Sequence, residues 1–130
     1  MKRTFLIYGS LFGMLAVIIG AFGAHALEKV LSADAIATFE TGVKYQMYHA
    51  LLLLFLGVQD VFTTKTLKIL RFLLVFGILL FSGSIYFLAT NSITSFNFRV
   101  IGFITPIGGS LLIIAWALIF IKLILKKSNK

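Results

Sequence analysis

The sequence predicts an all-α integral membrane protein, a four-transmembrane-helix bundle that forms a single domain over residues 1–130. Hydrophobic residues make up 60% of the chain and charged residues only 12%, whereas a soluble domain has about 45–50% and about 25%. A soluble protein this small has too little interior to hide so much apolar surface. The apolar residues also fall into four long blocks, close to the roughly 20 residues that a helix needs to cross a bilayer.

The same composition excludes soluble enzymes, disordered linkers and nucleic-acid-binding modules. The net charge is +8, but the basic residues flank apolar blocks, so we expect no nucleic-acid partner. The chain has no cysteine, which excludes disulfides, thiolate metal sites and cysteine catalysis. It has no glycine-rich phosphate loop, HExxH motif or nucleophile elbow. We therefore expect no catalytic residue and no metal site, and the sequence leaves any cofactor unknown.

The first span is expected at about residues 5–25, because residues 5–24 carry no charge. Small residues let helix backbones pack closely in lipid, and one side of this helix holds Gly9, Gly13, Ala16, Gly20 and Gly23. We predict that this stripe packs against a neighbouring helix. The alternative is a cleaved signal peptide ending near Ala24 and Ala26, but its apolar stretch would exceed the usual length of about 7–15 residues.

A polar segment follows at about residues 27–39, and we expect an interfacial helical stretch there that leads into span two. Ser32 is a suitable N-cap, with Asp34 in the first turn of the helix. The second span is expected at about residues 40–59, since the chain is uncharged from Tyr45 to Gln59.

Span two carries the candidate functional residues. One face holds Thr38, Gly42, Tyr45, His49 and Leu56, and Thr41 and Gln46 flank it. His49 matters most, because an ionisable side chain in hydrocarbon is costly unless it is paired or faces a cavity. It lies about 15 Å deep, counting back from Gln59. We expect a neutral imidazole that points into the bundle, since burial disfavours the charged form.

Two explanations of His49 stay open. In the structural explanation, it bonds to a polar group of another span, with Ser82, Ser84 and Ser110 as candidates. In the functional one, it is a proton relay, a metal or haem ligand, or a contact for a quinone headgroup. His25 ends span one, and we expect it to cap the outer end through Thr41 or Tyr45. The two imidazoles would stand about 15 Å apart along the membrane normal, which makes joint ligation of one haem awkward.

Spans three and four are expected at about residues 72–91 and 100–121. Small or polar residues mark their contact faces: Gly77, Ser84 and Asn91 on span three, and Gly102, Pro106 and Gly109 on span four. We predict that the glycines make close helix contacts and that Pro106 kinks span four.

Lysine and arginine set the expected orientation. They concentrate before span one, between spans two and three, and after span four; with four spans, that side carries nine basic residues against three on the other. Cytoplasmic segments carry such an excess. We therefore expect both termini in the cytoplasm and a multi-pass protein of the inner membrane.

Five motifs bear a resemblance to a known family: GAFGAHAL at 20–27, FETGVKYQ at 39–46, YHAL at 48–51, LFSGSIY at 80–86, and TPIGG at 105–109 with Trp116. The chain resembles small membrane proteins of unknown function, among them YgdD-like and YwdK-like bacterial proteins and a small eukaryotic transmembrane relative. Ala115 departs from that pattern, where a glycine is common. The resemblance implies a four-span inner-membrane protein and supplies no reaction, cofactor or substrate.

The functional interpretation is accordingly broad. The sequence favours a non-enzymatic accessory or assembly factor, embedded in the lipid bilayer as a homo-oligomer or as part of a larger membrane complex. The alternative is a small oligomeric transporter or channel with a polar path near His49, and a weaker alternative is haem or redox binding.

Overall fold

The computed structural model describes residues 1–94, 97, 100 and 102–126. All regular elements among the described residues are helices, which confirms the all-α prediction. The helices are α1 (Lys2–Ile18), a π-helical turn (Ile19–Gly23), α2 (Ala24–Leu27), α3 (Ala33–Val58), α4 (Thr64–Ala89), a 3₁₀ turn (Asn91–Ile93) and α5 (Ile104–Leu125). α1, the π-helical turn and α2 run on as one helix of 26 residues.

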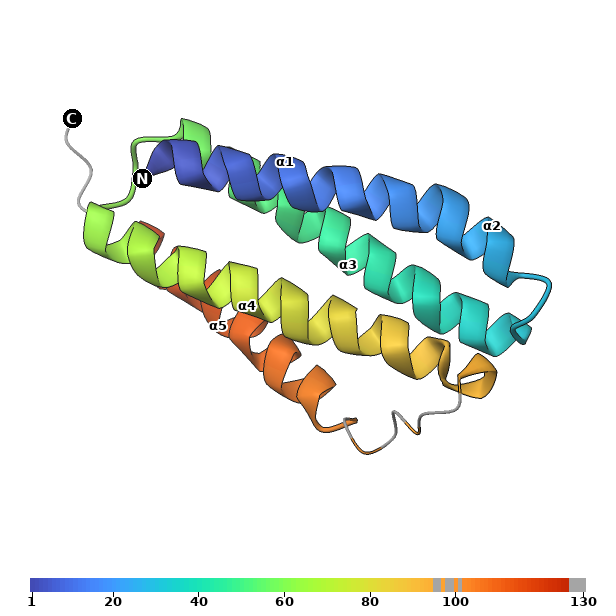
Figure 1. The fold of residues 1–130 in the computed structure, drawn as a ribbon. Coiled ribbons are helices and arrows are strands. Elements are labelled where there is room, and N and C mark those ends of the chain that lie inside the picture. The colour runs from blue at the N-terminus through green and yellow to red at the C-terminus, as the bar shows by residue number, and fades with distance from the viewer. Residues whose placement is uncertain (95–96, 98–99, 101, 127–130) are drawn as a thin grey trace.

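The long helices pack in chain order. α1 packs against α3, α3 against α4, and α4 against α5 (Figure 1). The N-terminus, the α3–α4 connection and the end of α5 meet at one end of the molecule: Lys2 forms an ion pair with Asp60, and the Lys126 ammonium donates to the Val61 carbonyl over 3.1 Å. α3 and α4 occupy the middle of this row and supply most of the fully buried leucines, including Leu53, Leu56, Leu70 and Leu74.

Local chemistry explains where α3 and α4 begin. The Ser32 hydroxyl accepts from the Ala35 N–H over 3.1 Å, which confirms the predicted N-cap. Thr63 caps α4 in the same way, through the Thr66 N–H at 3.2 Å. Such caps satisfy N–H groups that a helix leaves unpaired. Because α3 begins right after Ser32, residues 33–39 of the expected interfacial segment form the first turns of the long helix rather than a separate element.

Two expectations for the second half of the chain differ from the structure. α4 begins at Thr64, eight residues before the expected span, because its polar first turns are helical as well. α5 begins at Ile104, so Gly102 lies in the turn before it and Pro106 lies in its first turn. Proline fits there because the first N–H groups of a helix have no partner within it. The predicted kink at Pro106 is therefore wrong, since no helical turn precedes it.

Three helices are long and apolar enough to cross a membrane: Lys2–Leu27, Thr64–Ala89 and Ile104–Leu125. α3 has the same length as α4, but polar residues between Thr38 and His49 dilute the apolar character of its first half. The described part of the chain thus has four long helices, of which three meet the composition of a membrane span.

Candidate functional site

His49 lies in the middle of α3 and points into the protein, with 4% of its surface exposed. Its Nδ1 lies 2.7 Å from the Tyr45 carbonyl oxygen, one turn earlier in the same helix. Its Nε2 lies 3.0 Å from the indole Nε1 of Trp116 on α5. Both ring nitrogens therefore have partners, and the second bond joins α3 to α5.

These partners determine the protonation of the imidazole. An indole nitrogen is only a donor, so Nε2 of His49 accepts from Trp116. The ring proton must then be on Nδ1, which donates to the Tyr45 carbonyl. A charged imidazolium would carry a proton on Nε2 and face another N–H group. The hydrogen bonds thus select the neutral Nδ1–H tautomer, the charge state expected from the sequence.

A cleft of about 380 Å³ opens beside this pair; we call it the His49 cleft. It lies between α3 and α5, with α4 behind them, and is lined by Thr41, Tyr45, His49, Phe81, Gly109, Leu112, Ile113 and Trp116. Aromatic rings dominate its walls: Tyr45 stacks on His49 at 6.3 Å between ring centroids and meets Phe81 edge-on at 5.2 Å. None of its lining residues carries a full charge.

Gln46 belongs to a different cluster, on the other side of α3. It is 4% exposed, and its amide nitrogen donates to the Phe12 carbonyl of α1 over 2.8 Å. Its amide oxygen accepts from the Tyr86 hydroxyl of α4 over 2.6 Å. We call Phe12, Gln46 and Tyr86 the Gln46 junction. One turn away, the Ser82 hydroxyl donates to the Gly42 carbonyl over 2.7 Å, so three hydrogen bonds tie α1, α3 and α4 together.

The candidate residues from the sequence therefore separate into three places. His49, Tyr45 and Thr41 share the cleft, and Gln46 lies in the junction. His25 lies at the far end in α2, where its side chain is 79% exposed and its Nδ1 is 3.6 Å from the Glu28 carboxylate. The expected cap through Thr41 or Tyr45 is wrong: His25 faces outward, and the Thr41 hydroxyl donates to Ala37 in its own helix.

The serines expected to pair with His49 have other partners. Ser82 donates to Gly42, Ser84 shares a hydrogen bond with Thr105, and Ser110 donates to Pro106 one turn back. Trp116 takes their place, and sequence reasoning missed that role. The available signal was that Trp116 is the only tryptophan in the chain and lies within an apolar span. A buried indole usually finds a hydrogen-bond acceptor, and Trp116 does so here although 49% of its surface is exposed.

The glycines expected to pack make contacts of very different tightness. A Cβ atom at Gly9 or Gly20 would lie 2.9 Å from side-chain carbons of α3, whereas one at Gly13 would lie at an ordinary 3.8 Å from Ala50. The corresponding distance at Gly23 is 3.2 Å, to Phe39. On the α4–α5 side, the distances are 2.6 Å at Gly77 and 3.4 Å at Gly109. Asn91 lies in the 3₁₀ turn beyond α4.

Gly108 is the tightest contact, and the sequence analysis did not assign it to a packing face. A Cβ atom there would overlap the backbone nitrogen of Phe81 on α4. α5 therefore touches α4 backbone to backbone at this point. Gly109, one residue later, faces the His49 cleft instead.

The geometry gives little support to haem ligation or to a polar transport path. Both nitrogens of His49 are engaged, so binding an iron would require Trp116 to move. No group of three potential metal-ligating side chains lies together among the described residues. The buried polar side chains within that same part of the chain all have hydrogen-bond partners, and most of these bonds join two helices rather than leaving donors and acceptors along a channel.

The sequence of the chain is similar to those of several bacterial membrane proteins. Residues 19–109 match a family described as "Protein of unknown function (DUF423)". A UPF0382 membrane protein of Staphylococcus saprophyticus is 46% identical over 119 residues, which cover 92% of this chain and 95% of the relative. The UPF0382 membrane protein YwdK of Bacillus subtilis is 39% identical over 127 residues, with 92% and 94% covered. A UPF0382 membrane protein of Haemophilus influenzae is 39% identical over 116 residues, with 89% and 90% covered. No solved structure matches the chain, and none of these names states an enzymatic activity.

Proposed function

Because this chain belongs to the DUF423 family, whose members are membrane proteins of unknown function, we propose a function from its own geometry. The chain is an integral membrane protein. Its His49 cleft binds a small, neutral, lipid-soluble molecule, and the protein performs no chemistry on that molecule. Such a binder fits the accessory role predicted from the sequence, in which the chain serves a larger membrane complex.

The His49 cleft is the observation that carries this proposal. Its volume of about 380 Å³ falls within the roughly 300–1,000 Å³ of small-molecule sites. Its lining lacks full charges, so a neutral ligand enters without an unpaired charge. Tyr45 lines the cleft and is 42% exposed, and its hydroxyl has no hydrogen-bond partner among the described residues. A ligand with a carbonyl or hydroxyl acceptor and an apolar ring satisfies both the hydroxyl and the aromatic walls.

The absence of chemistry follows from what surrounds His49. Acid–base catalysis needs an imidazole nitrogen that can reach the substrate, and both nitrogens of His49 are held by Tyr45 and Trp116. The lining of the cleft also offers no carboxylate, lysine or thiol beside the imidazole. The residues thus suit recognition of a ligand rather than its conversion.

The proposal includes four spans and an orientation. α3 matches α4 in length and lies between two apolar helices, and its polar groups face protein rather than lipid at Gln46 and His49. Among the described residues, seven basic side chains lie at the end that holds the N-terminus and only Lys29 and Lys44 toward the other; Arg99, Lys127 and Lys130 lie outside the described residues. The basic end faces the cytoplasm of a bacterial inner membrane.

Cysteine labelling tests this topology, because the chain has no native cysteine. Thr64→Cys at the basic end should be shielded from an impermeant thiol reagent in intact cells. Ser92→Cys, in the 3₁₀ turn at the opposite end, should react. Reaction of Thr64→Cys from outside would reverse the orientation, and reaction of both would rule out a fixed four-span arrangement.

Trp116 fluorescence tests the binding function directly, because the single tryptophan lines the cleft. Menadione, a neutral two-ring quinone with two carbonyl acceptors, is a suitable probe. We expect saturable quenching in the purified wild-type protein. Gly109→Leu should fill the cleft and leave only linear, collisional quenching. Gly83→Leu is the matched control, since a Cβ there meets nothing within 4 Å and lies on the opposite side of α4.

The outcomes of this titration are distinct. Saturable quenching that survives Gly109→Leu, and also a second filling change such as Ile113→Phe, would place the probe elsewhere and overturn the proposal. Linear quenching in the wild type would do the same. Circular dichroism of each variant establishes that the helices remain intact, so that a loss of binding reports on the cleft.

A further inference from the structure

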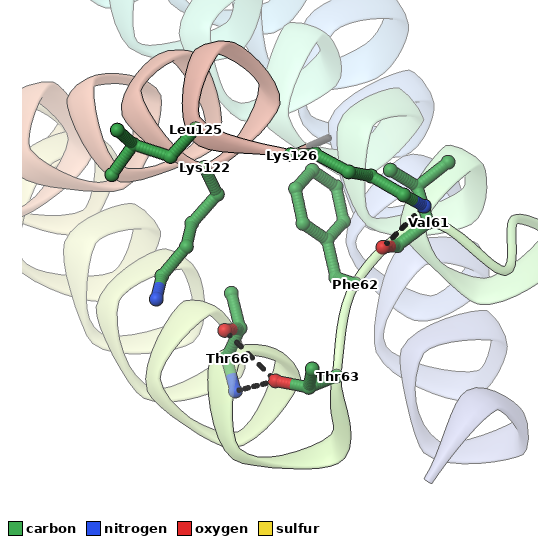
Figure 2. Close-up of a pocket in the computed structure, with 7 residues that line it drawn as sticks. All are labelled: Val61, Phe62, Thr63, Thr66, Lys122, Leu125 and Lys126. Carbon is green, nitrogen blue, oxygen red and sulfur yellow. Dashed lines mark hydrogen bonds between the residues drawn. The ribbon is translucent and has the colours of Figure 1, made fainter. Parts of the chain in front are cut away.

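The basic end of the molecule holds a second cavity, unrelated to the His49 cleft. It has a volume of about 310 Å³ and lies where the α3–α4 connection, the start of α4 and the end of α5 meet. Figure 2 shows the residues that line it: Val61, Phe62, Thr63, Thr66, Lys122, Leu125 and Lys126. It therefore combines two lysines, two hydroxyl side chains and three apolar side chains in one recess.

The two lysines are not neutralised by carboxylates. Lys122 reaches from α5 toward the first turn of α4, beside Thr63 and Thr66 (Figure 2), and has no hydrogen-bond or ion-pair partner among the described residues. The Lys126 ammonium donates to the Val61 carbonyl, which is uncharged. Asp60 is the one acidic residue described at this end, and Lys2 already pairs with it. The cavity thus carries uncompensated positive charge.

The start of α4 adds to this positive potential. The first N–H groups of a helix have no partner within it, and the helix dipole places partial positive charge there. The Thr63 hydroxyl accepts from the N–H of Thr66. The backbone N–H groups of Thr64 and Lys65, also in the first turn of α4, have no partner within the helix. An anion between Lys122 and α4 therefore gains from the lysine charge and from the helix start together.

The apolar half of the cavity identifies what kind of anion fits. Phe62 and Leu125 wall the recess, and the outer surface of α5 continues from Leu125 as an exposed apolar face that includes Ile121 and Ile124. A free inorganic anion would bind to the lysines but make no contact with the apolar walls. A phospholipid uses both, with its phosphate at the lysines and its acyl chains along α5.

We propose that this cavity binds the headgroup of an anionic phospholipid, with Lys122 and Lys126 holding the phosphate. Basic pockets between transmembrane helices at the cytoplasmic side are suited to such headgroups. The bound lipid fixes the end of α5 against the α3–α4 connection. This site does not depend on the His49 cleft, and either proposal can fail alone.

Native mass spectrometry of the purified protein tests the site, with phosphatidylglycerol and phosphatidylcholine of identical acyl chains as probes. We expect one phosphatidylglycerol to remain bound in preference to phosphatidylcholine. Lys122→Gln should weaken phosphatidylglycerol binding about fivefold, as should Lys126→Gln, because each lysine near a lipid surface contributes about that factor. Lys122→Arg keeps the charge and should retain the lipid.

Lys68→Gln is the matched control. It removes one charge from the same end of the protein, but Lys68 lines a different groove, beside Tyr8 and Arg71. Equal weakening by Lys68→Gln and Lys122→Gln would mean diffuse attraction to the whole basic end and would overturn the site. Equal retention of the two lipids by the wild type would overturn it as well. Displacement of the lipid by inorganic phosphate at a matching concentration would show a free-anion site instead.

Discussion

The two sides of the α3–α4 pair use polar side chains in opposite ways. On the side of α1, a single amide of the Gln46 junction joins three helices through Phe12 and Tyr86, and a smaller recess of about 190 Å³ lies beside it. On the side of α5, the His49 cleft is open, and one hydrogen bond between His49 and Trp116 crosses it. Gln46 and His49 are three residues apart in one helix and equally buried.

The difference shows that burial alone does not distinguish a polar side chain that holds helices together from one that can contact a ligand. In the junction, the amide nitrogen, the amide oxygen and the Tyr86 hydroxyl each have a partner on another helix, so a ligand would compete with bonds that are already made. In the cleft, the Tyr45 hydroxyl and the aromatic walls remain available, because α3 and α5 stand apart on either side of α4. We therefore expect substitutions in the junction to affect stability and substitutions in the cleft to affect binding.

The largest effect should come from the contact on which the cleft is built. Gly108→Ala places a methyl group onto the Phe81 backbone, which neither helix can relieve by turning a side chain. We expect a loss of about 3 kcal/mol in the free energy of unfolding, the upper part of the range for overpacking. Unfolding in mixed micelles with sodium dodecyl sulfate measures it.

Gly109→Ala is the control for that change, one residue further along. The added methyl group would lie 3.4 Å from the Phe81 ring edge, and a ring can shift where a backbone cannot. We expect its stability to remain within about 0.5 kcal/mol of the wild type. Equal losses at both positions would mean that α5 does not rest on α4 through Gly108.

The second effect concerns the Gln46 junction. Gln46→Leu removes the bond to Phe12 and the acceptor of the half-buried Tyr86 hydroxyl, so we expect a loss of about 1–2 kcal/mol in the free energy of unfolding, the range found for such bonds in model membrane peptides. Saturable quenching of Trp116 by menadione should remain, since the junction lies away from the cleft. If Gln46→Leu abolished menadione binding and left the stability unchanged, the binding role would belong to the junction side and our assignment would be wrong.

The sequence predicts most of the helices but few of the hydrogen bonds between them. Long apolar blocks indicate the helices, and Ser32 indicates where α3 begins, because both depend on residues close together in the chain. Which polar groups meet depends on helices 30 to 70 residues apart: Gln46 meets Phe12 and Tyr86, and His49 meets Trp116. The helical period places Gln46 and His49 near one another without saying that they face different neighbours.

Pro106 and Gly108 illustrate a second limit. Apolar composition alone extends span four back to about residue 100, so Pro106 falls inside it and a kink follows. The helix in fact begins at Ile104, where proline needs no kink. Gly108 differs from the other glycines in how close the neighbouring backbone comes: an added Cβ would overlap the Phe81 backbone nitrogen there, whereas at Gly9 it would lie 3.0 Å from a backbone atom, and this distance depends on how α5 crosses α4.

The third effect tests the bond across the cleft. Trp116→Phe removes the N–H that donates to His49 and keeps an aromatic wall, so the cost in unfolding free energy should be about 0.6 kcal/mol, an average value for such bonds between membrane helices. The matched change on the other side of this bond is His49→Gln, which retains a donor and an acceptor and should preserve the fold. A folded His49→Gln protein that has lost its cellular role would indicate chemistry specific to the imidazole. A loss well above that of Gln46→Leu in either variant would show that the cleft side holds the protein together.

The smallest effect on stability should come from Tyr45→Phe, and it separates the two sides most cleanly. Tyr45 lines the cleft, and its hydroxyl has no partner in the described part of the chain, so its removal should leave stability within about 0.5 kcal/mol of the wild type. Its loss should weaken menadione binding about fivefold, since a hydrogen bond contributes about 1 kcal/mol. Tyr86→Phe is the matched change in the Gln46 junction: it removes the donor to Gln46, so it should lower stability and leave the affinity for menadione unchanged. If the two variants gave the same pattern in both measurements, the separation of a fastening side from a binding side would be wrong, because identical removals of one hydroxyl would then have identical consequences.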